Sequence, residues 1–386
     1  MEENAPPSSY TPPPFAAPPP PPPLTPPPVI VPPAATPPRR RGRGWMIFAL
    51  VLLVLLGFSL LANLGHLFNS LVPIKVGHVN SVGPRLDEVV SEDNGAASKI
   101  AVIEVNGVIM SRAIDQSGYG MVEVIKAQLK RAEEDDKVKA VILKVDSPGG
   151  EVLASDDISR AIADFQTKPH SKPVVCSMGG LAASGGYYVS APCRWIVAND
   201  LTITGSIGVI MSTWNYRGLM DKVGVRPETF KSGKYKDMLS GSREPGSITA
   251  EEREMVQALI DETYGKFKHV VASGRQRAQE KNRDKGRTLA EDWADYADGR
   301  ILSGTEAFKL GFVDELGTFE DAIKRTKLIA GIRNANLIEY QQRYDISDLF
   351  RLFGKTDAKA IKVDLGMDMP KLQAGQLYFL SPSFLH

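Results

Sequence analysis

The sequence L-A-A-S-G-G-Y-Y-V-S, from Leu181 to Ser190, joins an apolar strand to an apolar, aromatic run that suits a buried helix. Ser184 lies at the junction, and the small residues on both sides leave its hydroxyl unshielded. At such a strand-to-helix turn a serine exposes its hydroxyl, and the N–H of Gly185 points outward from the start of the helix. The stretch therefore predicts a nucleophile elbow. The alternative is a glycine-rich turn at which two backbones pack closely.

Segments around this stretch alternate between apolar strands and helices with one apolar face. Strands are expected at 100–105, 140–145, 174–178 and 195–198. Gly179 and Gly180 are expected to end the third of these strands. Helices are expected at 121–133, 152–165 and 249–275, the last with a capping box formed by Thr249 and Glu252. Such dense apolar strands are typical of parallel sheets buried on both faces, so the pattern predicts an α/β fold of layered parallel sheets with flanking helices.

Composition limits the classes of function. The 386 residues carry a net charge of +1, so no overall field favours binding to nucleic acid. The two cysteines, Cys176 and Cys193, lack metal-ligand spacing, and the sequence leaves open whether they form a disulfide. The five histidines are scattered, and none lies beside a glycine-rich turn, so a Ser-His-Asp triad is not expected. No cofactor and no metal site are expected either.

Three segments of distinct composition precede the globular part. Residues 1–38 are dominated by proline and are expected to form a disordered tail. A short basic flank, 39–44, leads to an apolar span at 45–64, which at about 1.5 Å per residue covers roughly the 30 Å hydrocarbon core of a bilayer. Because basic residues flank only its N-terminal side, this single transmembrane helix should leave the tail in the cytoplasm and the rest of the chain outside. A cleaved signal peptide is the alternative, disfavoured by the 44 preceding residues and the absence of a small-x-small cleavage site.

The remaining chain divides into a connector at 65–97, a globular domain at 98–340 and an extension at 341–386. Within the domain, G-K-Y-K-D-M-L-S at 233–240 is expected to be a loop or short turn. The extension is irregular, although 377–380 has the composition of an edge strand or of a segment that contacts a partner.

Two glycine-rich turns follow buried strands, S-P-G-G at 147–150 and A-A-S-G-G at 182–186. In parallel sheets such turns gather at the carboxyl ends of strands, where sites form. The N–H groups of Gly150 and Gly185 would there make a two-donor oxyanion hole, in which one donor typically stabilises a transition state by about 2.7–4 kcal/mol. A phosphate-binding loop is disfavoured because no G-K-[ST] ending follows. Ser147 is expected to cap its turn.

Five motifs together resemble the signal peptide peptidase A family, also called protease IV, whose members are membrane-anchored serine peptidases. They occur in order: D-S-P-G-G at 146–150, A-A-S-G-G-Y-Y at 182–188, T-G-S-I-G-V at 204–209, K-S-G-K-Y-K-D at 231–237, and A-D-G-R to V-D-E-L-G at 297–317. The resemblance implies a crotonase/Clp-protease-like layered fold and ring- or dome-shaped homo-oligomers with the active sites inside. The proline-rich tail is not a family feature, and Glu151 stands where some relatives carry a third glycine.

The family uses a Ser-Lys dyad, so the resemblance implies Ser184 as nucleophile, Lys236 as general base and Ser206 as the residue that orients the amine. A lysine acts as a base only when neutral, so the pKa of Lys236 must fall from about 10.4 toward neutrality, as burial in an apolar cleft would cause. Alternatives stay open. Lys234 is the nearest rival base, most lysines are solvated surface charges, and Ser206 has the setting of a turn residue.

The resemblance implies a serine endopeptidase of the cell membrane that hydrolyses cleaved signal peptides and other short apolar peptides through an acyl-enzyme. Two other functions are alternatives. A scaffold of the same fold would bind apolar peptides without cutting them, although intact Ser184 and Lys236 argue against it. A crotonase-type enzyme would act on acyl-CoA with the oxyanion hole and without a serine nucleophile.

Overall fold

The computed structural model describes residues 48–57, 59, 83–112, 119–168, 171–283, 285–342 and 377–380. The chain divides into two compact units, Met1–Val79 and Asn80–His386. In the first unit residues 48–57 are helical, inside the predicted anchor at 45–64. Within the described ranges, no helix has the length and apolar character needed to cross a membrane. The predicted tail at 1–38, the basic flank at 39–44 and the remainder of the anchor span lie outside the described residues.

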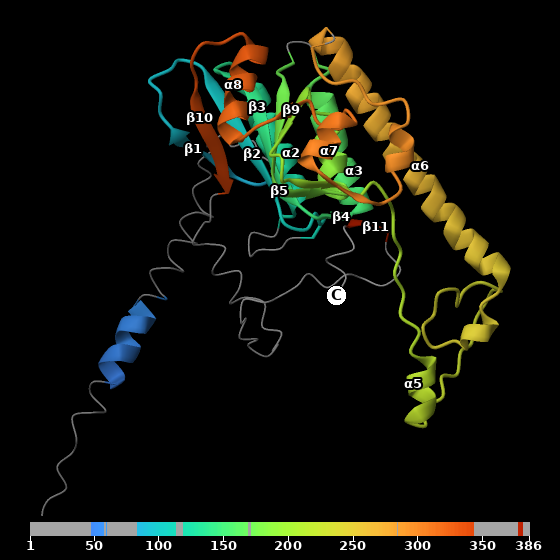
Figure 1. Ribbon diagram of the computed structural model, residues 1–386. Coiled ribbons are helices and arrows are strands. Elements are labelled where there is room, and N and C mark those ends of the chain that lie inside the picture. Colours follow the sequence, from blue (N-terminus) through green and yellow to red (C-terminus); the bar gives the residue numbers. More distant parts are fainter. Residues whose placement is uncertain are drawn as a thin grey trace, which may run out of the picture. The chain divides into compact units, whose positions relative to one another are not determined.

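Nine of the described strands form one mostly parallel sheet at the centre of the second unit (Figure 1). In spatial order its main path is β1 (Leu86–Glu92), β10 (Asn336–Gln342), β2 (Lys99–Asn106), β3 (Val138–Ser147), β5 (Val174–Ala183), β6 (Trp195–Ala198) and β9 (Glu315–Leu316). Strand β7 (Ile203–Gly205) pairs with the second half of β5, and β8 (Ile301–Ser303) pairs with β7. Neighbours from β10 to β9 run parallel, whereas β1 is antiparallel to β10. The predicted α/β fold with a mostly parallel sheet is confirmed.

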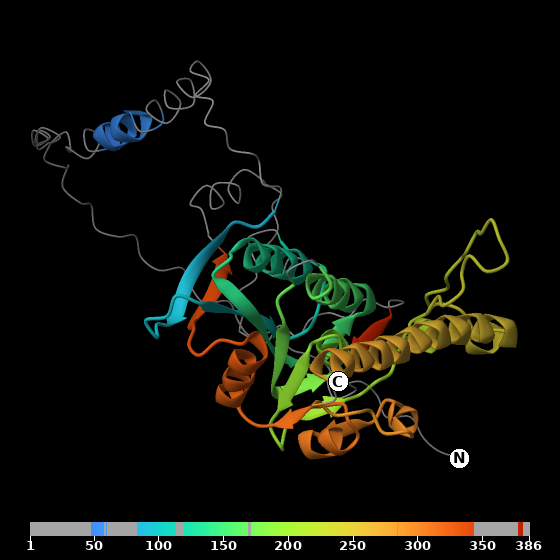
Figure 2. The ribbon, with the colours of Figure 1, turned by 90° about the horizontal axis from the view of Figure 1, so that it is seen from above.

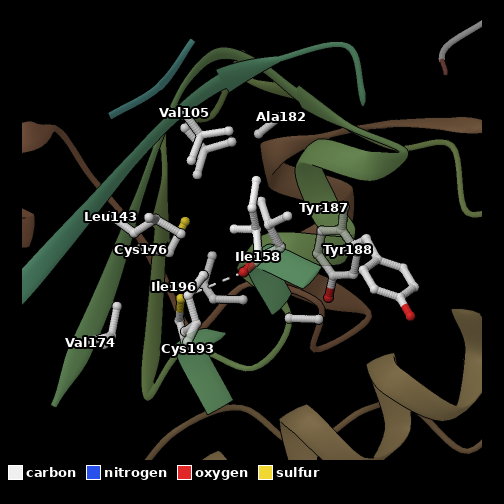
Figure 3. Close-up of a cluster of buried hydrophobic side chains, with 14 of the residues drawn as sticks. Val105, Leu143, Ile158, Val174, Cys176, Ala182, Tyr187, Tyr188, Cys193 and Ile196 are labelled. Carbon is white, nitrogen blue, oxygen red and sulfur yellow. Dashed lines mark hydrogen bonds between the residues drawn. The ribbon is translucent and has the colours of Figure 1, made fainter. Parts of the chain in front are cut away.

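Helices cover both faces of this sheet. One face carries α2 (Met121–Glu134), α3 (Val152–Phe165) and α4 (Gly185–Ser190), and Figure 2 shows α2 and α3 side by side. Alternate strand residues, among them Val105 and Leu143, pack on these helices, and Figure 3 shows this part of the core. The intervening residues, among them Ile100 and Ile142, pack under α8 (Phe319–Ala330) on the other face. Burial of both faces explains why the strand sequences are apolar without alternation.

Gly179 and Gly180 do not end β5, contrary to the prediction. The strand runs on to Ala183, and its first half pairs with β6 while its second half pairs with β7. The backbone beyond the glycines stays bonded because the Asp146 carboxylate accepts the Leu181 N–H at 3.0 Å. The two glycines therefore mark a change of neighbouring strand, and the elbow comes at the end of the second half.

The sequence pattern indicates neither β1, which lies inside the predicted connector 65–97, nor α8 and β10. All residues of β1 after the first are exposed, so this strand lacks the alternation by which a half-buried strand is identified. The part of the connector at 65–82 lies outside the described residues.

Helix α6 (Ala250–Asn282) is longer than the predicted span 249–275, and Thr249 and Glu252 form the predicted capping box. Its second half packs on the domain through Arg275, whose guanidinium pairs with the buried Asp314 carboxylate. Its first residues lie away from the sheet, together with α5 (Arg217–Lys222), as Figure 1 shows. Residues 211–260, at this end of α6, are here called the arm.

Short elements complete the second unit. Helix α7 (Gly304–Lys309) follows β8, and two 3-10 turns occupy Pro245–Ser247 and Trp293–Tyr296. A separate two-stranded sheet pairs β4 (Gly149–Glu151) with β11 (Tyr378–Leu380). The stretch 377–380, predicted to be an edge strand or a partner contact, thus contains a strand, and this strand also bridges to Ile210 on its other edge. The rest of the extension beyond Gln342 lies outside the described residues.

Candidate active site

Ser184 lies at the turn between β5 and α4, where the sequence predicts a nucleophile elbow. Its φ of 54° and ψ of −116° are unusual for a residue that is not glycine. Its N–H donates to the Gly205 C=O, and its C=O accepts the Tyr188 N–H, each at 2.8 Å, so the turn is held at both ends. The side chain is only 1 % exposed, and its hydroxyl has no hydrogen-bond partner among the described residues. A strained backbone with a buried, unpaired hydroxyl is typical of a functional site.

The two predicted oxyanion donors lie on turns that touch. A Cβ atom added to Gly149 would lie 2.6 Å from the Gly185 nitrogen, and one added to Gly185 would lie 3.1 Å from the Gly150 nitrogen. Side chains are excluded here because the two backbones approach so closely. The Ser147 hydroxyl accepts the Gly149 N–H at 3.1 Å, so Ser147 caps its turn as predicted.

Ser206 lies beside Ser184, at the end of the strand that pairs with the second half of β5. It is buried, has a φ of 50°, and donates its N–H to the Arg300 C=O at 2.7 Å. Among the described residues other than glycine, positive φ occurs at Ser184, Ser206, Leu239 and Arg283. Two of these four therefore adjoin each other at the site, as expected where a precise geometry is imposed on the backbone.

Lys236 does not lie with these residues in a single chain. It is an exposed residue of the arm, in the predicted loop between α5 and α6. Figure 1 shows this loop at the end of α6 that is far from the sheet. The described part of one chain thus brings together Ser184, Ser206, Gly150 and Gly185, but not the predicted base.

The other two lysines of the K-S-G-K-Y-K motif are engaged in ion pairs. The Lys231 Nζ lies 2.7 Å from the Asp237 carboxylate, and the Lys234 Nζ lies 2.8 Å from the Glu251 carboxylate. The hydrogen bond that Lys234 donates to the Glu251 carboxylate raises the pKa of Lys234 above its usual value, so this amine keeps its proton. No hydrogen bond or ion pair joins the Lys236 side chain to another described residue. Lys234 is therefore the poorer base, and Lys236 is available to a group from elsewhere.

Ser155 lies at the site although the sequence did not single it out. It is fully buried in the first turns of α3, and its hydroxyl has no partner in the part of the chain that the structure describes. A Cβ atom on Gly185 would lie 2.7 Å from this hydroxyl. A signal existed, because Ser155 falls on the buried stripe of α3 with Ile158 and Ile162, where a polar side chain is unexpected.

Cys176 and Cys193 are both free, buried thiols on the core side of α4, as Figure 3 shows. Burial raises the pKa of the Cys193 thiol. Within the described ranges, no group of three or more His, Cys, Asp or Glu side chains is placed to hold a metal ion.

Known proteins resemble the chain over this region. Residues 166–333 match Peptidase family S49. A putative protease of Methanocaldococcus jannaschii is 45% identical over 209 residues, which cover 54% of this chain and 61% of that protein. A putative protease of Synechocystis sp. is 42% identical over 234 residues, or 61% of this chain and 75% of that protein. The putative signal peptide peptidase SppA of Enterococcus faecium is 37% identical over 260 residues, or 66% and 71%. The chain belongs to peptidase family S49.

Membership of family S49 confirms the resemblance that the five motifs predict, and it assigns the chain to the serine peptidases, hydrolases of peptide bonds. The range matched to family S49 begins in the turn after α3 and contains Ser184, Ser206 and Lys236. The S-P-G-G turn with Gly150 precedes it.

Proposed function

We propose that this chain is a membrane-bound serine endopeptidase that hydrolyses cleaved signal peptides and other short apolar peptides. The observation that carries the proposal is the buried, unpaired hydroxyl of Ser184 on a strained turn, beside the backbone nitrogens of Gly150 and Gly185. The substrate class is extended from the Enterococcus faecium relative, which is named a putative signal peptide peptidase.

In the proposed reaction the Ser184 Oγ attacks the carbonyl carbon of the peptide while the Lys236 amine takes the hydroxyl proton. The N–H groups of Gly150 and Gly185 donate to the carbonyl oxygen as it becomes negative. The C–N bond then breaks, and Lys236 gives the proton to the departing amine. Water next attacks the ester with Lys236 again as base, which releases a carboxylate and restores Ser184. Ser206 holds the amine toward Ser184 by a hydrogen bond.

The lysine in this scheme comes from a second copy of the chain. The arm that carries Lys236 exposes large apolar side chains, with Trp214 80 % and Phe230 88 % exposed. An open hollow of ≈ 400 Å³ in the arm is lined in part by Trp214, Leu239 and Val256. Apolar surface of this kind favours contact with another protein surface. In a homo-oligomer, the arm of one copy would cover the elbow of the next copy, which would bury the apolar side chains of the arm and bring Lys236 to Ser184. The contact would also exclude water, which favours the neutral form of the Lys236 amine.

The membrane location follows from the span at 45–64, which we propose as a single-pass anchor in the lipid. Its basic N-terminal flank favours a cytoplasmic tail and a catalytic domain outside the cytoplasm. In this arrangement the anchor holds the active site close to peptides that remain in the bilayer.

The test uses the full-length assembled protein and a synthetic signal peptide, with products identified by mass spectrometry. Wild type should produce fragments, and Ser184→Ala should produce none while keeping the same oligomeric state. A Ser184→Ala protein that cuts as fast as wild type would exclude Ser184 as nucleophile. A wild type that binds the peptide without cutting it would favour the scaffold.

A further inference from the structure

We propose that a cleft between α2 and β10, apart from the catalytic residues, binds the free N-terminus of a short apolar peptide. The cleft has a volume of ≈ 610 Å³ and lies where the neighbouring strands β2 and β10 separate. On β10 the pairing with β2 ends at Glu339, although β10 runs on to Gln342 and β2 runs on to Asn106. This inference rests on the proposed function for the source of the peptide, since each cut releases a fragment with a new N-terminus.

The side chains at this cleft leave three buried polar atoms without a hydrogen-bond partner. They are the Gln128 Oε1, the Tyr340 hydroxyl and the Gln342 Oε1, and all three residues line the cleft. In the rest of the chain that the structure describes, three more such atoms occur, and two of them are the elbow hydroxyls of Ser184 and Ser155. Buried polar atoms without a partner are rare because they cost free energy, so a cluster of them indicates a binding site.

These three residues are neighbours. Tyr340 is only 3 % exposed, and Gln342 stands two residues further along β10, so both side chains leave the strand on the same face. The Gln128 Nε2 of α2 donates to the Tyr340 C=O at 2.8 Å, which fixes the amide and leaves its Oε1 as the free acceptor. The cleft thus offers two amide oxygens and a phenol oxygen, and an ammonium group has three N–H donors to match them.

The charge of the cleft favours a cation. Two glutamates, Glu104 and Glu339, are among the described residues that line it, and no described lysine or arginine does so. The Glu104 carboxylate is neutralised by the Lys144 Nζ, which lies 2.9 Å away. Glu339 forms no ion pair or hydrogen bond with another described residue. Its negative charge is therefore free to pair with an ammonium group, and hydrogen bonds between charged groups are stronger than neutral ones.

The remaining wall of the cleft is apolar or aromatic. Met121, Val124 and Ile125 of α2 line one side, together with Tyr119 just before the helix. Binding sites commonly combine such a wall with a few polar groups that fix the orientation of the ligand. The N-terminus of an apolar peptide fits this combination, because it carries an ammonium group next to apolar side chains.

The cleft lies at the same edge of the sheet as the elbow. Strands β10, β2, β3 and β5 are parallel neighbours, Gln342 is the last residue of β10, and Ser184 directly follows β5. Three strand spacings of about 4.8 Å separate β10 from β5 by roughly 14 Å, which an extended chain of about four or five residues covers. The cleft would therefore hold a fragment released by one cut within reach of the nucleophile for a second cut.

The experiment measures binding by isothermal titration calorimetry on the full-length, assembled Ser184→Ala protein, so that it does not depend on cleavage. The ligand is a synthetic apolar tetrapeptide amide, used once with a free and once with an acetylated N-terminus. Acetylation should weaken binding about tenfold or more, because it removes the charge and two N–H donors. Glu339→Gln should weaken binding of the free peptide about tenfold. Glu291→Gln, the same change at an exposed position outside the cleft, should leave binding unchanged.

Tyr340→Phe separates a role in binding from a role in folding. The change removes only an unpaired hydroxyl, so the thermal midpoint of unfolding should not fall, whereas affinity for the free peptide should fall about fivefold. With an intact Ser184, Glu339→Gln should raise KM for peptides with a free N-terminus and leave kcat unchanged.

Equal affinities for the free and the acetylated peptide would overturn the inference, as would an unchanged affinity of Glu339→Gln. Leucine amide that binds as tightly as the tetrapeptide would overturn the assignment to a peptide. These results leave the proposed function standing, because cleavage at Ser184 does not require the cleft. A wild type that cuts no peptide, while Ser184→Ala binds the free N-terminus as expected, would contradict the proposed function and support the binding site.

Discussion

The backbone of Ser184 adopts a conformation that a purely structural serine would avoid. A residue held in a sparsely populated φ/ψ region costs on the order of 1–3 kcal/mol, and a buried hydroxyl without a partner costs about as much. The surrounding strand and helix hold the residue there through hydrogen bonds at both ends of the turn. The conformation of Ser184 therefore lowers the folding stability of the protein, as is common at residues that act in catalysis.

Ser184→Gly should therefore be inactive and more stable than wild type. Glycine accepts positive φ without strain, and the change removes the unpaired hydroxyl. We expect the free energy of unfolding to rise by about 1–2 kcal/mol, measured by denaturant titration. Ser190→Gly is the matched control, because the Ser190 hydroxyl is buried in the same helix but donates to the Gly186 C=O at 2.7 Å, so its loss should destabilise. Equal destabilisation by both changes would argue against strain at the elbow.

Lys236 and Lys234 differ in their partners, and this difference is testable. Lys236→Ala should lower kcat/KM for peptide hydrolysis by at least about 1000-fold, because the nucleophile loses its base. Lys234→Ala breaks an exposed pair with Glu251 and a cation–π contact with Tyr235, and it should stay within about threefold of wild type. If a steady-state assay shows the larger loss for Lys234→Ala, Lys234 and not Lys236 is the general base.

At the scale of elements, the start of α6 holds the arm together through one carboxylate. Glu252 pairs with Arg243 at 2.6 Å and accepts the Thr249 N–H at 2.8 Å. The hydrogen bond from Arg243 lowers the pKa of Glu252 to about 2. The pair thus links the helix to the loop that carries Lys236.

The lowered pKa predicts how the arm responds to acid. The stabilising contribution of Glu252 is full above the unfolded carboxyl pKa of about 4.3 and disappears as pH falls through about 2, because the unfolded arm binds the proton more readily. Hydrogen-exchange protection of residues 211–260, corrected for intrinsic rates, should fall between pH 5 and pH 2. Glu252→Gln should show weaker protection already at pH 7 and little further loss, and the exposed Glu262→Gln should behave like wild type. Identical profiles for the two variants would rule out this role.

Elements with a clear local sequence pattern could be predicted, whereas elements that depend on contacts with distant parts of the chain could not. Helix α3 has its predicted bounds, because its apolar stripe repeats with the helical period. Strand β5 extends past Gly179, because a long-range bond from the Asp146 carboxylate replaces the missing local preference. Strand β1 was missed because its side chains are exposed.

The same limit applies to the candidate site. Ser184, Ser206 and the two glycines were predictable, because each follows closely after the end of a strand of the sheet, and the carboxyl ends of parallel strands converge. The pairing of Phe379 with Gly150 was not predictable, because it joins segments more than two hundred residues apart. No sequence pattern indicates either that the arm, at the start of α6, places Lys236 far from Ser184 of the same chain.

At the scale of the whole molecule, the proposed nucleophile and base lie on different copies of the chain. Ser184 is built into the core beside the sheet, whereas Lys236 lies on an arm whose apolar side chains are exposed. Closed rings repeat one heterologous contact, so a single arm-to-elbow contact completes every site. Activity should therefore depend on assembly.

Co-expression of Ser184→Ala and Lys236→Ala chains with different tags, followed by tandem purification of mixed oligomers, tests this claim most directly. Each variant alone should be inactive. In mixed oligomers, an intact Ser184 meets an intact Lys236 of its neighbour at roughly a quarter of the sites, so peptide hydrolysis should return to about that fraction of wild type. Mixed oligomers that stay as inactive as the two parents, while wild-type oligomers purified in the same way cut the peptide, would contradict a dyad shared between copies.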